Sequence, residues 1–112
     1  MLRLSQINKV FLALSIFTAV IFGLNGCAKP GPNQVFIRNY AFNPSTITIS
    51  PGTTLTWENK DLGDHTSSSD SSVWDSGHIS PKSSYTFTFT TPGTYTYHCN
   101  IHTSMHGTVI VK

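Results

Sequence analysis

The chain has few cysteines and few charges, and both scarcities restrict what it can be. Only two of its 112 residues are cysteine, and 11% are charged. All five acidic residues lie after residue 26, where an equal number of bases balances them. A domain that binds nucleic acid normally carries a basic patch, and a remainder with no formal net charge offers none. We therefore expect no nucleic-acid partner.

No apolar run is long enough to cross a bilayer as a helix. The longest, Val10–Leu24, falls short of the roughly 20 residues that a span requires. It follows a basic start without acids, and this order is typical of a secretory signal peptide. The sequence LNGC, which ends at Cys27, resembles the bacterial lipobox, whose cysteine is lipidated and becomes the new N-terminus. We predict a leader over residues 1–26 and lipidation of Cys27; the alternatives are an ordinary signal peptide and an uncut N-terminal anchor.

Lipidation of Cys27 leaves Cys99 without a partner for a disulfide. Outside the cytoplasm, thiols normally become disulfides. A lone thiol there is either buried and inert or bound to a metal. A disulfide between Cys27 and Cys99 is the competing explanation. We expect the mature protein to be extracytoplasmic and anchored to a membrane by its lipid.

Helical periodicity is absent after the leader, and strand periodicity takes its place. Residues 27–33 end in AKPGPN, which is typical of a tether. Aromatic and β-branched residues then alternate with threonine in segments that are bounded by Pro-Gly turns, which is typical of half-buried strands. The predicted strands cover residues 34–40, 46–50, 54–59, 84–90, 94–99 and 107–112.

The remaining stretch, residues 60–83, is rich in serine and aspartate. We predict that it forms loops around one or two short edge strands. Short strands at this spacing build a β-sandwich or barrel. We therefore predict a single all-β domain over residues 34–112.

Soft metal ligands gather where the alternation breaks down near the end of the chain. Two residues separate Cys99 from His102, and two more separate His102 from Met105. Thiolate and thioether favour Cu(I), imidazole suits Cu(II), and a His₂Cys set with a weak axial methionine is the blue-copper electron-transfer arrangement. Zinc prefers four strong ligands, and a thioether is not one. A further ligand must come from elsewhere, and His65 is the best candidate, with His78 as the other.

From Val35 to Lys112 the sequence resembles a cupredoxin of the plastocyanin/amicyanin family. The matching pieces are NYAFNPSTITISPGTTLTWENKD, DHT, WDSG, TFTTPGTYTYHC and MHGTVIVK, and C-x-x-H-x-x-M is similar to the short ligand loop of amicyanins. The resemblance implies an eight-stranded Greek-key sandwich with one copper ion at one end. Asp64 stands where the family often has proline. The ligands that the resemblance implies are His65, Cys99, His102 and Met105.

These features predict a mononuclear type 1 (blue) copper protein that carries single electrons between protein redox partners. We expect a monomer that transforms no substrate and is therefore not an enzyme by itself. A copper delivery or storage protein with the same ligands is the alternative, and an adhesion domain without metal is a third possibility. We expect Asn59 and Thr66 to support the ligand loops through hydrogen bonds. His98 and His106 are expected to point outward.

Overall fold

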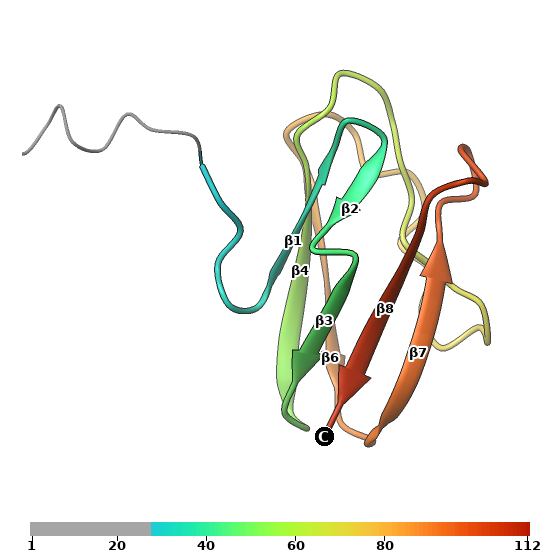
Figure 1. Ribbon diagram of the computed structural model, residues 1–112. Helices are drawn as coiled ribbons and strands as arrows, with labels where there is room; N and C mark the ends of the chain where they lie inside the picture. Colours follow the sequence, from blue (N-terminus) through green and yellow to red (C-terminus); the bar gives the residue numbers. More distant parts are fainter. Residues whose placement is uncertain (1–27) are drawn as a thin grey trace, which may run out of the picture.

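The computed structural model describes residues 28–112 and arranges them as eight strands in two sheets (Figure 1). The first sheet has the order β2-β1-β4-β6, and the second has the order β3-β8-β7-β5. Two pairings are parallel, β1 with β4 and β3 with β8, and the others are antiparallel. The predicted all-β fold of about eight strands is confirmed. The strands are β1 (Gln34–Arg38), β2 (Ala41–Asn43), β3 (Thr46–Ile49), β4 (Thr53–Asn59), β5 (Ser68–Ser69), β6 (Ser84–Phe89), β7 (Gly93–His98) and β8 (His106–Val111).

The predicted leader and Cys27 lie outside the described residues. Within residues 28–112, no helix has the length and apolar character needed to cross a membrane.

The core lies between the two sheets and follows from the alternation in sequence. Because successive side chains of a strand point to opposite faces, every second residue can be buried. Leu55 and Trp57 of β4 have no exposed surface, and neither have Tyr97 of β7 and Val109 of β8. The rings of Trp57 and Tyr97 meet edge to face across the sandwich, with centroids 5.6 Å apart. The threonines between these positions stay on the outer faces.

The first predicted strand was too long. The structure ends β1 at Arg38, and Asn39 and Tyr40 both have a φ of 55°. This left-handed conformation reverses the chain, so that Ala41 on β2 pairs with Arg38. The strand β2 was not predicted, because the alternation of large and small residues continues through the turn. Asparagine enters the left-handed region more readily than most residues, and it was the one local sign of the reversal.

Residues 60–83 behave as predicted. They hold one two-residue strand, β5, at the edge of the second sheet beside β7. An isolated bridge joins His65 to Ile79, and Trp74 folds back onto the core with its ring centroid 5.6 Å from that of Trp57.

Three connections meet at the end of the sandwich opposite the C-terminus (Figure 1). They are the β1–β2 turn, the segment between β4 and β5, and the loop between β7 and β8. The predicted ligands lie in the second and third of these connections.

Candidate metal centre

The segment after β7 folds into a compact loop that carries three of the predicted ligands. The N–H of Cys99 donates to the carbonyl of Met105 over 3.1 Å, and the N–H of Met105 donates to the carbonyl of His102 over 2.9 Å. Cys99 has no exposed surface and Met105 is 2% exposed, whereas His102 is half-buried. The loop therefore buries the thiol and the thioether and leaves part of the His102 imidazole near the surface.

His65 comes to this loop from a distant part of the sequence. Its backbone pairs with Ile79, since the N–H of His65 donates to the Ile79 carbonyl over 3.2 Å and the Ile79 N–H donates back over 2.7 Å. Three residues later β5 pairs with β7, with Ser68 opposite His98. This pairing brings the His65 segment against the start of the ligand loop, and the His65 side chain is fully buried there.

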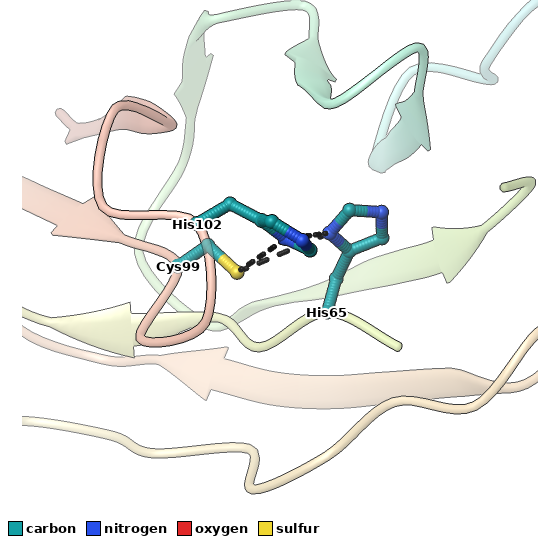
Figure 2. A group of neighbouring side chains, drawn as sticks. All are labelled: His65, Cys99 and His102. Carbon is teal, nitrogen blue, oxygen red and sulfur yellow. Dashed lines mark hydrogen bonds between the residues drawn. The ribbon is translucent and has the colours of Figure 1, made fainter. Parts of the chain in front are cut away.

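Three donor atoms converge (Figure 2). The Cys99 Sγ atom lies 3.9 Å from Nδ1 of His65 and 3.9 Å from Nδ1 of His102, and the two Nδ1 atoms are 3.2 Å apart. A point in the plane of these atoms lies about 2.1 Å from each, within the roughly 2.0–2.3 Å that nitrogen and sulfur ligands keep from a zinc-sized metal ion. The three side chains could therefore hold one metal ion between them.

A carboxylate that the sequence analysis missed fixes the His65 ring. Asp61 Oδ2 lies 2.9 Å from His65 Nε2, and the N–H groups of Asn39 and Tyr40 donate to the same carboxylate over 2.7 and 2.9 Å. Because an ionised carboxylate can only accept hydrogen bonds, Nε2 of His65 carries the imidazole proton. Nδ1 of His65 then has a lone pair that faces the Sγ atom of Cys99. Burial raises the pKa of Asp61, but the hydrogen bonds from Tyr40, Asn39 and His65 outweigh it and lower the pKa below its ordinary value. In the sequence, the only sign of this contact was the spacing of four residues between Asp61 and His65.

The predicted support from Asn59 and Thr66 is confirmed. The Asn59 side chain donates to the carbonyls of Gly63 and Ile79, both over 2.8 Å, and so spans the segment that carries His65. The N–H of Thr66 points to Cys99 Sγ over 3.4 Å, and the Thr66 hydroxyl accepts from the N–H of Asn100 over 2.8 Å. An N–H directed at the sulfur stabilises a thiolate, which is the form that binds metal.

The other histidines of the described chain lie apart from the cluster. His78 pairs with Asp64 over 3.3 Å at the surface, where their side chains are 66% and 44% exposed. Asp64 is therefore turned to His78, although it directly precedes His65. His98 points outward as expected, and a hydrogen bond from its ring to Asp70 raises its pKa. His106 is exposed.

The comparisons with known proteins agree with this geometry. The family model described as a cupredoxin-like domain matches residues 11–111. A variant of amicyanin in its oxidized state is 28% identical over 70% of this chain and 80% of its own, with a TM-score of 0.68. A purple cupredoxin from Nitrosopumilus maritimus is 25% identical over 70% of this chain and 98% of its own, with a TM-score of 0.66.

A larger protein also contains a similar unit. The copper-containing nitrite reductase from Thermus scotoductus SA-01 is 26% identical over 80% of this chain, with a TM-score of 0.69. The match covers 24% of the reductase chain, so the likeness extends to one part of that enzyme.

Proposed function

We propose that this chain, which belongs to the cupredoxin-like family, is a type 1 copper protein. In this role it carries single electrons between protein partners. Copper is the cofactor of this family, and the donor set suits it. The observation that carries the proposal is the convergence of one thiolate and two imidazole nitrogens on a single point. A bound copper ion supplies one-electron chemistry by alternating between Cu(II) and Cu(I).

The proposal assigns a role to each of four side chains. Cys99, His65 and His102 would hold the copper ion through their converging sulfur and nitrogen atoms, and the buried Met105 would supply a thioether as a weaker fourth ligand. Cys99, His65 and Met105 are buried, and the hydrogen bonds of Asp61 and Thr66 hold two of them in place. A framework that moves little between oxidation states lets an electron pass with little rearrangement of the ligands.

The surface around His102 is suited to a protein partner. His102 is the one half-buried member of the donor cluster, and exposed apolar side chains occupy the same loops: Tyr40 is 58% exposed, Leu62 97% and Ile101 41%. Apolar, aromatic surface with little charge is typical of the centre of a protein interface. We expect electron donors and acceptors to dock over these residues, and the protein to act as a monomer.

The proposal also includes export and anchoring. Residues 1–26 have the order of a secretory leader, and LNGC places Cys27 where a lipoprotein is lipidated. The tether that follows is mostly exposed up to the start of β1. An electron carrier held to a membrane outside the cytoplasm would remain close to membrane-bound redox partners.

Two other functions are compatible with the same fold. A copper delivery or storage protein would bind Cu(I) with the same ligands but would not need a trigonal site suited to both oxidation states. The nitrite reductase shows that a similar unit can belong to an enzyme. Among residues 28–112, however, the only cluster of three or more metal donors is the one at Cys99. We therefore favour a carrier without a substrate of its own.

The visible spectrum tests this proposal. Loaded with Cu(II), the purified protein is expected to show an intense thiolate-to-copper charge-transfer band, which Cys99→Ser and His65→Ala abolish or severely weaken. His78→Ala is the matched control, because His78 is exposed and lies apart from the cluster, and it should leave the band intact. Weak d–d absorption alone would overturn the type 1 assignment. Tight binding of Cu(I), together with the absence of that band from the Cu(II)-loaded protein, would favour delivery or storage.

A further inference from the structure

Tyr40 lies against both histidines of the metal centre, although it comes from a different loop. Its ring is edge-on to the His65 imidazole, with centroids 5.3 Å apart and planes at 80°. It is also edge-on to the His102 imidazole, with centroids 4.8 Å apart and planes at 88°. Edge-to-face packing at this distance is attractive and depends on orientation. Tyr40 therefore resists rotation of either imidazole.

The two histidines differ in what else restrains them. His65 is fully buried, and Asp61 binds its Nε2 atom. In the part of the chain that the structure describes, polar contacts of the His102 ring run only from Nδ1, toward Cys99 and His65. Among residues 28–112, no polar group forms a hydrogen bond with the Nε2 atom of His102. The orientation of the His102 ring consequently depends on packing, and Tyr40 supplies an aromatic contact on it.

The backbone of Tyr40 is held in a conformation that an ordinary residue disfavours. With a φ of 55°, it occupies the left-handed region, which is costly for any residue with a Cβ atom. Such strain persists only where the surroundings enforce it, and it occurs preferentially at functional sites. Here Asp61 enforces it, because one carboxylate oxygen accepts from the Tyr40 N–H while it also contacts His65 Nε2.

We propose that Tyr40 is a positioning residue that holds the His102 imidazole toward the metal, and that Asp61 sets the place of Tyr40. One carboxylate thus secures His65 directly and His102 through the Tyr40 ring. This inference rests on the proposed metal centre. It adds a restraint on the ligand that the loop itself leaves least supported, and that restraint opposes loss of His102 from the metal.

Three variants separate this role from a general effect on folding. Tyr40→Phe keeps the ring. Tyr40→Gly removes the ring and relieves the left-handed strain, so the thermal midpoint of the metal-free protein should not fall sharply. Leu62→Ala is the matched control, because Leu62 lines the same surface hollow as Tyr40 and is 97% exposed.

The first measurement needs no metal. Nuclear magnetic resonance of the histidine-labelled, metal-free protein is expected to show one restrained His102 ring in wild type, Tyr40→Phe and Leu62→Ala, and a mobile ring in Tyr40→Gly. The second measurement follows copper loss to an excess of chelator. Tyr40→Gly should lose copper about tenfold faster, which corresponds to about 1.4 kcal/mol and lies within the range of an aromatic pair. Tyr40→Phe should stay within about twofold of wild type, since its ring packs in the same way.

The outcomes are distinguishable from those for the proposed function. If Tyr40→Gly leaves both the motion of the His102 ring and the rate of copper loss unchanged, the positioning role is wrong. This holds whether or not the protein shows the charge-transfer band. A thermal midpoint that falls sharply in Tyr40→Gly together with a mobile ring would assign Tyr40 to folding and also overturn the proposal. If the charge-transfer band is absent from wild type but the His102 ring still loosens only in Tyr40→Gly, the proposed function fails and the positioning role stands.

Discussion

At the scale of single residues, the feature that most affects the centre is the carboxylate of Asp61. The hydrogen bonds that it accepts lower its pKa below the ordinary value, so it is a carboxylate at neutral pH, beside the fully buried proposed ligand His65. A histidine whose second nitrogen donates to a carboxylate is a stronger and better oriented ligand than a free one. The negative charge also stabilises the more positive, oxidised state of a nearby metal.

Asp61→Asn is therefore expected to weaken copper binding and raise the reduction potential. Loss of a hydrogen bond that orients a ligand costs about 10- to 100-fold in metal affinity. If the oxidised form alone loses tenfold in stability, the potential rises by about 59 mV. Competition with a chelator and voltammetry measure the two effects.

Asp64→Asn is the control for that experiment, because it removes an equal charge from an exposed carboxylate that pairs with His78 rather than with a ligand. An equal change of potential in both variants would show that the effect is one of general charge and not of the bond to His65.

At the scale of elements, the pairing of β7 with β8 supports the ligand loop at its base. Tyr97 lies opposite Gly107 in this pairing and has no exposed surface. A Cβ atom on Gly107 would overlap the Tyr97 ring. The glycine is thus required for close approach and not for an unusual backbone angle.

Gly107→Ala should destabilise the fold by about 1–3 kcal/mol, the usual cost of overpacking a filled core. Urea unfolding of the metal-free protein measures this loss. Gly93→Ala, on β7 of the same sheet, is the matched control, because its added Cβ atom would meet the Tyr95 ring at an ordinary 3.5 Å. Its effect should stay within about 0.5 kcal/mol, as for most surface substitutions. Equal losses in the two variants would contradict the packing argument.

At the scale of the whole molecule, the described residues form a sandwich that follows the proposed tether and Cys27 in the sequence. The described residues place the metal centre at one end of the sandwich and the C-terminus at the other (Figure 1). The first described residues, from Ala28 to Asn33, form a mostly exposed segment before β1. This arrangement would leave the surface around His102 open to the proposed partner, with the proposed anchor preceding the tether in the sequence.

We expect the full-length protein, expressed in a bacterium with its own leader, to fractionate with membranes. Cys27→Ser should release it or block its processing. Cys99→Ser is the matched control, since it removes the other cysteine and should leave the protein in the membrane fraction. Membrane fractionation and the mass of the mature N-terminus test the prediction, and an unmodified Cys27 at that N-terminus would show it to be wrong.

The sequence by itself determined the fold class and three of the four proposed ligands. Strand alternation is a local property, because the side chains of a strand repeat every two residues whatever their partners are. Cys99, His102 and Met105 share one loop, so their proximity follows from their spacing alone. The short edge strand in residues 60–83 was predictable for a similar reason, because that stretch has too few apolar residues for longer strands.

Only the tertiary structure decided how the distant parts meet. His65 and His78 were both open as ligands from spacing, and the pairing of β5 with β7 brings His65 to Cys99 while His78 stays at the surface. The parallel pairing of β1 with β4 places Ile37 opposite Asn59, and so carries the β1–β2 turn and Tyr40 toward Asp61 and the histidines. Such contacts depend on strand order and register, which periodicity within one segment does not encode.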